Sequence, residues 1–483
     1  MKDKIIKRWQ GPGGFAEVLR IATPLVLSTS AHTVQMFIDR MFLTWHSSEA
    51  MAAAMPAGIT AFVIVSFFMG LVSYANTFVA QYTGAGRPHR VGPAVWQGIY
   101  LSLAAAALVL PMIWSAKHIF RLMDHGPVVQ QYEVTYFRIM CVGVGPVLIC
   151  SAISCFFTGR GKTWTVFKIN LVATILNIVL DYGLILGHFG LPRWGIAGAG
   201  WATVTANIIA MLLYIVLFFR KRYRRRYATW RGSRPDIDLF RRMMRYGLPN
   251  GIQFMLDILA FDLFIAFVGR INPVTLAANT MTFSINMLSF LPMMGFGIAV
   301  TTMVGQSLGS NKPDLAKRCT WSAFYITFGY MSLVALGYWF YPEIFLFPFS
   351  IRAHPQEFAQ IEPLVKNLLH FVALYCIFDT GNIIFAAALK GAGDTRFVMM
   401  VLVSFSWTLM VLPCYLAVKF SWGAGKGLYV AWGFVTVYVC VVAVVFLARF
   451  LQGKWETMRV IEQVAPTIPY VVAEVPASEA EVN

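Results

Sequence analysis

Long apolar runs are the feature that most constrains how this chain can fold. The runs that are long enough to cross a membrane lie at roughly 15–45, 50–83, 95–115, 130–157, 164–187, 196–220, 247–270, 276–308, 316–341, 363–389, 396–419 and 427–451. Lipid offers no hydrogen-bond partners to the backbone, so such spans form helices. Of the 483 residues, 58% are hydrophobic and 13% are charged, which excludes an ordinary soluble domain. The sequence therefore predicts an all-α integral membrane protein with twelve transmembrane helices.

Basic residues are distributed unevenly among the loops between these runs. The termini and the even-numbered loops hold 29 Lys and Arg residues, and the odd-numbered loops hold 8. The positive-inside rule then places both termini in the cytoplasm, and we expect a bacterial inner membrane as the location. The densest group has eleven basic residues between Arg220 and Arg245. We interpret it as a topogenic linker rather than a surface for anionic lipid or nucleic acid, so the expected partner is the bilayer and not nucleic acid.

The two halves of the chain are related by an internal repeat. The repeated pairs include Gln81 and Gln306, Gly84 and Gly309, Pro88 and Pro313, and Gly159 and Gly391. The first three pairs are 225 residues apart and the last is 232 apart. Each half has six spans, so the copies share one orientation, which predicts two six-helix bundles related by a pseudo-two-fold axis along the membrane normal. This architecture is typical of alternating-access transporters.

The repeat also divides the chain into expected domains. These are a cytoplasmic N-terminal tail (1–14), an N-lobe (15–220), a basic cytoplasmic linker (221–246), a C-lobe (247–451) and a cytoplasmic, disordered tail (452–483). The final segment is assigned to disorder because it becomes rich in Pro, Glu, Ala and Val.

A stripe of polar residues runs along the fifth span. Asn170, Thr174, Asn177 and Asp181 are spaced four, three and four residues apart, so they share one face of a helix. A carboxylate within a span costs roughly 2.5–3.5 kcal/mol on insertion scales, which favours a functional role. The alternative is that Asp181 lies at the membrane surface and only marks the end of the helix.

Three other spans carry an aspartate with polar neighbours at helical spacing. The groups are His32, Gln35 and Asp39; Asn250, Gln253 and Asp257; and Tyr375, Asp379 and Asn382. Asp262 is turned away from Asp257 and is a candidate interhelical hydrogen-bond partner. Clusters of carboxylate, amide and hydroxyl oxygens can hold a hard cation such as Na⁺, or they can carry a proton on a buried carboxyl. We expect no other metal and no cofactor besides this coupling ion.

The sequence contains no arrangement that points to catalysis. No Ser-His-Asp set or His-Glu-x-x-His motif is present, and the seven cysteines form no Cys-x-x-Cys pair. We therefore expect a protein that is not an enzyme.

These motifs resemble the multidrug and toxic compound extrusion (MATE) family, and within it the bacterial NorM-like group. The matching residues are Asp39 in span one, Asn177 and Asp181 in span five, and the segment 195–203 at the start of span six. The resemblance implies that Asp39, Asn177, Asp181 and Thr203 bind the coupling cation or proton in the N-lobe.

NorM-like members also have a cation or cargo site in the C-lobe, which is matched here by Asp257, Tyr375 and Asp379. The family usually has glutamate at the position of Asp257, and the shorter aspartate puts the geometry of a Na⁺ site in question. The expected supporting polar residues are Gln35, Asn170, Thr174, Gln253, Asn279, Asn286 and Asn382.

The resemblance implies a monomeric secondary active exporter of drugs or metabolites, driven by H⁺ or Na⁺ antiport. The expected cargo is a small organic molecule that is cationic or amphipathic. The alternative is a flippase for a lipid-linked oligosaccharide on the same superfamily fold. Such a flippase would need several cationic residues for pyrophosphate, whereas Arg40 and Arg138 are the only basic residues well inside the expected spans.

Overall fold

The computed structural model of the chain describes residues 8–123, 125–350, 355–419 and 427–462, and within these ranges it contains helices and no strands. The helices of the first half are α2 (Phe15–His46), α3 (Ser48–Ser73), α4 (Ala75–Gly84), α5 (Pro88–Val109), α6 (Met112–Arg121), α7 (Pro127–Thr158), α8 (Thr163–Leu186) and α9 (Ile196–Phe218). A short helix, α10 (Lys221–Arg226), and the 3-10 turn η1 (Arg231–Ser233) follow.

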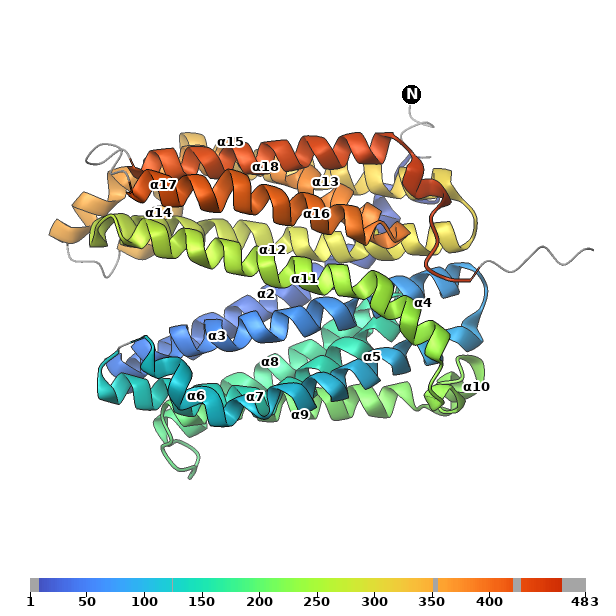
Figure 1. Cartoon of the computed structure of the whole chain (residues 1–483), viewed down its shortest axis with the longest axis horizontal. Helices are drawn as coiled ribbons and strands as arrows, with labels where there is room; N and C mark the ends of the chain where they lie inside the picture. The colour runs from blue at the N-terminus through green and yellow to red at the C-terminus, as the bar shows by residue number, and fades with distance from the viewer. Residues whose placement is uncertain (1–7, 124, 351–354, 420–426, 463–483) are drawn as a thin grey trace, which may run out of the picture.

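The second half repeats this pattern. Its elements are α11 (Ile237–Gly269), α12 (Pro273–Gly309), α13 (Pro313–Phe340), α14 (Pro342–Ser350), α15 (Pro355–Ala392), α16 (Thr395–Phe405), the π-helix η2 (Ser406–Val411), α17 (Leu412–Lys419), α18 (Gly427–Leu451) and the 3-10 turn η3 (Lys454–Thr457). The two sets of helices form two bundles that lie side by side (Figure 1).

Eleven helical segments in the described part of the chain are long and apolar enough to span a membrane. Two of them are composite: α3 continues into α4, and α16 continues through η2 into α17. The twelfth span is α2, which has 32 residues and is less apolar because it carries the polar face with His32, Gln35 and Asp39. The predicted layout of twelve helices in two bundles is confirmed.

Two prolines of the internal repeat mark where their helices begin. The repeated prolines Pro88 and Pro313 occupy the first positions of α5 and α13, where the missing N–H of proline costs no hydrogen bond. α5 therefore begins seven residues before the predicted span 95–115. α5 ends before Pro111, and the short helix α6 follows. The predicted span 95–115 therefore lies too far toward the C-terminus.

The predicted linker and tail need correction. α11 begins at Ile237, inside the predicted linker 221–246, because the Asp236 side chain caps it by accepting a 3.0 Å hydrogen bond from Leu239 N. The first part of the predicted disordered tail, residues 452–462, is folded. In it Trp455 is fully buried and stacks on Phe450 at 4.9 Å between ring centroids. The rest of the predicted tail lies outside the described residues.

The two bundles touch along helices from both halves. α12 packs against α2 and α4, and α11 packs against α3. The N-terminal end, α10 and the C-terminal end of the described chain lie at the same end of the molecule (Figure 1).

Candidate functional site

The polar stripe of α8 faces the interior of the N-lobe. Asn170 Nδ2 donates a 2.7 Å hydrogen bond to Ser28 Oγ of α2, and its Oδ1 accepts one of 3.0 Å from the Tyr214 hydroxyl. Thr174 Oγ1 donates to Gln35 Oε1 at 3.2 Å. The predicted shared face of α8 is therefore present, and it packs against α2 and α9.

The farther end of this stripe brings two carboxyl groups together. Asp181 of α8 and Asp39 of α2 lie close enough to interact electrostatically. Asp181 and Asn177 are fully buried, and Asn177 Nδ2 donates to Thr203 Oγ1 of α9 at 3.5 Å. The Tyr136 side chain of α7 interacts electrostatically with both carboxyl groups. The four N-lobe residues singled out from the sequence thus meet in space.

This N-lobe cluster presents oxygen atoms that lack hydrogen-bond donors. Asp39 Oδ1, Asn177 Oδ1 and both Asp181 oxygens are buried, and none has a hydrogen-bond partner among the described residues. Two carboxylates in contact repel each other unless a proton or a cation lies between them. Buried polar atoms without partners are rare because each costs free energy. The cluster therefore has the chemistry of a site for one proton or one hard cation.

In the C-lobe, polar residues of α12, α15 and α18 surround a second acid. Asn382 Nδ2 donates to Asp379 Oδ1 at 3.3 Å, and Asn286 Nδ2 donates to the Tyr375 hydroxyl at 3.0 Å. Asn279 is fully buried and accepts a 2.9 Å hydrogen bond from Trp432 Nε1. Of the predicted supporting residues, Asn382 therefore bonds Asp379 directly, and Asn286 bonds Tyr375, one helical turn before Asp379 on α15.

Asp257 of α11 is the other predicted acid of the C-lobe. Its Oδ2 accepts a hydrogen bond from Gln253 Nε2, and Gln253 Oε1 accepts one from Lys390 Nζ at 2.5 Å. Tyr438 of α18 interacts electrostatically with both Asp257 and Asp379. Asp262 does not join them. Its buried Oδ2 has no hydrogen-bond partner among the described residues, so the expected interhelical bond is not seen.

Sequence reasoning missed Tyr136, Tyr438 and Lys390. The predicted tenth span, 363–389, ends one residue before Lys390, whereas α15 continues to Ala392. Arg40 and Arg138 are therefore not the only basic residues inside the spans. A signal was available, since a spacing of eleven residues from Asp379 is about three helical turns and places both side chains on one face.

Repeated residues close the two lobes against each other at one end. Gln81 Nε2 donates a 3.0 Å hydrogen bond to the carbonyl oxygen of Gly391 in the C-lobe. Its repeat counterpart Gln306 donates one of 2.7 Å to the carbonyl oxygen of Gly159 in the N-lobe. Glycines and glutamines that the sequence pairs by repeat thus exchange symmetric contacts across the pseudo-two-fold axis. We call this region the closed end.

The folded residues 452–462, here named the C-terminal strap, cross the closed end. Glu456 pairs with Lys317 of the C-lobe at 2.9 Å. Farther along, Val460 N donates to Gln81 Oε1 of the N-lobe at 2.9 Å. The strap therefore touches both lobes.

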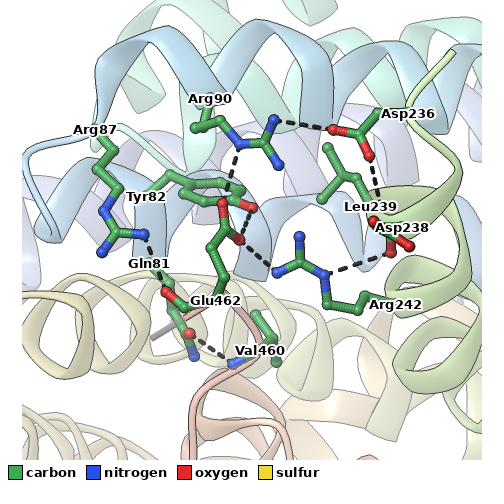
Figure 2. A network of polar contacts seen from close by, with 10 residues as sticks. All are labelled: Gln81, Tyr82, Arg87, Arg90, Asp236, Asp238, Leu239, Arg242, Val460 and Glu462. Atoms are coloured by element: carbon green, nitrogen blue, oxygen red, sulfur yellow. Dashed lines mark hydrogen bonds and ion pairs between the residues drawn. The ribbon is translucent and has the colours of Figure 1, made fainter. Parts of the chain in front are cut away.

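Glu462 is the last described residue of the strap and the centre of a charged network (Figure 2). It accepts hydrogen bonds from the Tyr82 hydroxyl at 2.7 Å, from Arg90 Nε at 3.1 Å and from Arg242 Nη1. Its carbonyl oxygen accepts a 3.0 Å bond from Arg87 Nη1. Burial opposes ionisation of Glu462, but the hydrogen bonds from Arg242 and Tyr82 outweigh it and lower the pKa to about 2.

Comparison with known proteins agrees with this architecture. A family model described as MatE matches residues 24–183 and 249–416, which covers most of both lobes. A probable multidrug resistance protein NorM of Brucella suis is 27% identical over 410 residues, covering 84% of this chain and 87% of the relative. Another, of Pseudomonas aeruginosa, is 25% identical over 453 residues, covering 92% and 90%.

Solved structures share the fold. A multidrug resistance MATE family transporter of the MOP superfamily, in an outward-facing conformation, matches with a TM-score of 0.83 at 18% identity and covers 94% of this chain and 99% of its own. A MOP superfamily transporter from Pyrococcus furiosus, for which reversed polarity of the binding pocket suggests a different function, matches with a TM-score of 0.83 at 19% identity and the same coverage.

Proposed function

Because the chain belongs to the MATE family of multidrug efflux transporters, we propose that it exports small organic molecules in exchange for H⁺ or Na⁺, by alternating access between its two lobes. The proximity of Asp39 and Asp181, together with their buried oxygens that lack hydrogen-bond partners, is the observation that carries this proposal. A buried pair of carboxyl groups changes its net charge when it gains or loses a cation, and antiport requires such a change.

The N-lobe cluster is the proposed ion-exchange site. Asp39 and Asp181 hold the proton or cation between them, and the free oxygen of Asn177 supplies a further ligand if the ion is Na⁺. Loss of the ion leaves two carboxylates in contact, and their repulsion favours a conformation that separates α2 from α8.

The C-lobe interior is the proposed cargo site. Asp257 and Asp379 supply negative charge for a cationic compound, while Tyr375 and Trp432, whose rings stack at 6.5 Å, supply aromatic surface. The division of labour is supported by the repeat, in which Asp181 corresponds to Pro413 and Asp379 to Val147. Neither acidic site is a simple duplicate of the other.

The proposed orientation follows from charge. The end that carries both ends of the described chain and the basic helix α10 lies in the cytoplasm. The lobes are closed at that end by the contacts of Gln81 and Gln306, so this conformation withholds both sites from the cytoplasm.

Flipping of a lipid-linked oligosaccharide is less well supported. A pyrophosphate group is usually held by several cationic side chains. Lys390 adds one basic residue to the C-lobe interior, but its ammonium group is engaged by Gln253 beside Asp257. A single lysine next to an acid favours a cationic ligand over pyrophosphate.

Transport into vesicles tests the proposal directly. Purified protein in proteoliposomes should move ethidium, a fluorescent lipophilic cation, when a H⁺ or a Na⁺ gradient is imposed separately. Asp181→Asn should abolish gradient-driven transport, whereas Asp262→Asn, a change of the same kind outside both sites, should not. Transport by Asp181→Asn at the wild-type rate would refute the ion-exchange role of the N-lobe cluster.

A further inference from the structure

Lys390 connects a positive charge to an acid of the C-lobe. Its Nζ donates a hydrogen bond of 2.5 Å to Gln253 Oε1, which joins α15 to α11. Gln253 is only 5% exposed, and its Nε2 donates to Asp257 Oδ2. The three side chains therefore form a continuous chain from an ammonium group to a carboxylate.

The carboxylate at the end of this chain keeps one oxygen free. Asp257 Oδ1 is buried and has no hydrogen-bond partner among the described residues. Arg449, another basic residue of the C-lobe, is engaged separately by Asp394 at 2.8 Å. Lys390 thus compensates the charge of Asp257 through a bridging amide, while Oδ1 stays available for a ligand.

The backbone around Lys390 is held in place from the other lobe. The Tyr74 hydroxyl of the N-lobe donates a 3.0 Å hydrogen bond to the carbonyl oxygen of Lys390. This bond fixes the turn of α15 that carries the lysine, so the side chain is presented to Gln253 from a defined position.

We propose that Lys390 determines cargo specificity as a tethered cation that competes with cationic cargo for Asp257. The inference rests on the proposed cargo-binding role of Asp257 and Asp379. When a cationic compound binds Oδ1, two positive charges share one carboxylate and repel each other, which weakens binding. A neutral compound meets no such repulsion. Lys390 therefore lowers the affinity for cations selectively and shifts the preference of the site toward neutral compounds.

Binding measurements on the purified full chain test this inference. The probes are tetraphenylphosphonium, a lipophilic cation, and chloramphenicol, which is neutral. Lys390→Gln and Lys390→Met should bind tetraphenylphosphonium more tightly by at least about fivefold, the lower end of a typical coupling between two sites. Chloramphenicol affinity should not change, and Lys390→Arg should behave as wild type. Lys366→Gln is the matched control, because Lys366 lies on the same helix and pairs with Glu343 and Glu362.

A double variant separates competition at Asp257 from a general effect of charge. In an Asp257→Asn background a cation is no longer held beside the lysine, so Lys390→Gln should raise tetraphenylphosphonium affinity by less than it does in the wild-type background. The double variant removes both charges together, which favours folding. An equal gain in that background would overturn the inference. So would weaker binding by Asp257→Asn without tighter binding by Lys390→Gln. If Asp257→Asn leaves tetraphenylphosphonium affinity unchanged, the proposed cargo site fails as well.

Discussion

The backbone of Gly84 packs directly against the carbonyl group of Gln306. A methyl group on Gly84 would lie 1.9 Å from that carbonyl oxygen, which is far inside van der Waals contact. The repeat counterparts mirror this arrangement, since a methyl group on Gly309 would lie 2.1 Å from the carbonyl oxygen of Gln81. The two lobes therefore approach each other through a pair of glycines that leave room for a facing backbone.

Enlarging either glycine should open the closed end. Gly84→Ala places a side chain against backbone atoms, which cannot rotate away, so the conformation described here becomes less favourable. We expect faster amide hydrogen exchange in residues 74–90 and 300–312, measured by mass spectrometry. Gly329→Ala is the control, because a methyl group there has no neighbour within 4 Å. Unchanged exchange in Gly84→Ala would mean that this contact does not hold the lobes together.

Replacing either N-lobe acid by its amide should abolish transport without lowering the stability of the fold. Asp39→Asn and Asp181→Asn should each abolish ion-driven efflux, because an amide cannot exchange a proton or neutralise a cation. Each change also removes one of two carboxyl groups in contact, so the melting temperature should equal or exceed that of wild type. Efflux in vesicles and a thermal melt in detergent check both expectations. A large fall in melting temperature would instead assign the pair a structural role.

The C-lobe acids should distinguish cargo by charge. Asp257→Asn combined with Asp379→Asn should weaken tetraphenylphosphonium binding by at least about tenfold, which corresponds to roughly 1.4 kcal/mol. Chloramphenicol binding should change far less, and ion binding at the N-lobe should survive. Equal losses for both probes would show that these acids maintain structure instead of recognising charge.

Glu462 should help to hold the closed end shut. Glu462→Gln removes a charge that joins the strap to Tyr82 and Arg90 of the N-lobe. Partly exposed ion pairs contribute at most about 1 kcal/mol to stability. Loss of this contribution should therefore raise the rate of hydrogen exchange at the start of α5 by about fivefold. Glu456→Gln is the matched control, since Glu456 pairs with Lys317 within the C-lobe. Equal effects of the two changes would argue against a role of Glu462 between the lobes.

The strap should be insensitive to pH in the neutral range. The pKa of Glu462 is lowered to about 2. Its ionised carboxylate therefore stabilises the closed end fully above the ordinary glutamate pKa of about 4.3, and this stabilisation is lost as the pH falls toward 2. The groups that face its side chain are Tyr82, Arg90 and Arg242. Exchange at the closed end, corrected for the intrinsic rate, should therefore be constant between pH 5 and 8. A change across that range would mean that another group controls the strap.

Much of the fold could be predicted from local sequence. Burial of apolar side chains in lipid depends on each segment alone, so the spans and their number were readable from the runs. The polar stripe from Asn170 to Asp181 was readable for the same reason, because helical spacing decides which side chains share a face. The internal repeat predicted two similar bundles, and helix ends were missed where prolines or the cap at Asp236 moved them.

The contacts between distant segments required the tertiary structure. Three interactions join residues that lie on separate elements. They are the interaction of Asp39 with Asp181, the hydrogen bond from Lys390 to Gln253, and the contacts of Glu462 in the strap with both lobes. Spacing within a helix says which face a residue occupies but not which helix packs against that face. The sequence by itself determined the membrane helices, their faces and the repeat. The packing of α2 on α8, the hydrogen bond from α15 to α11 and the position of the strap on the closed end decided which charges act together.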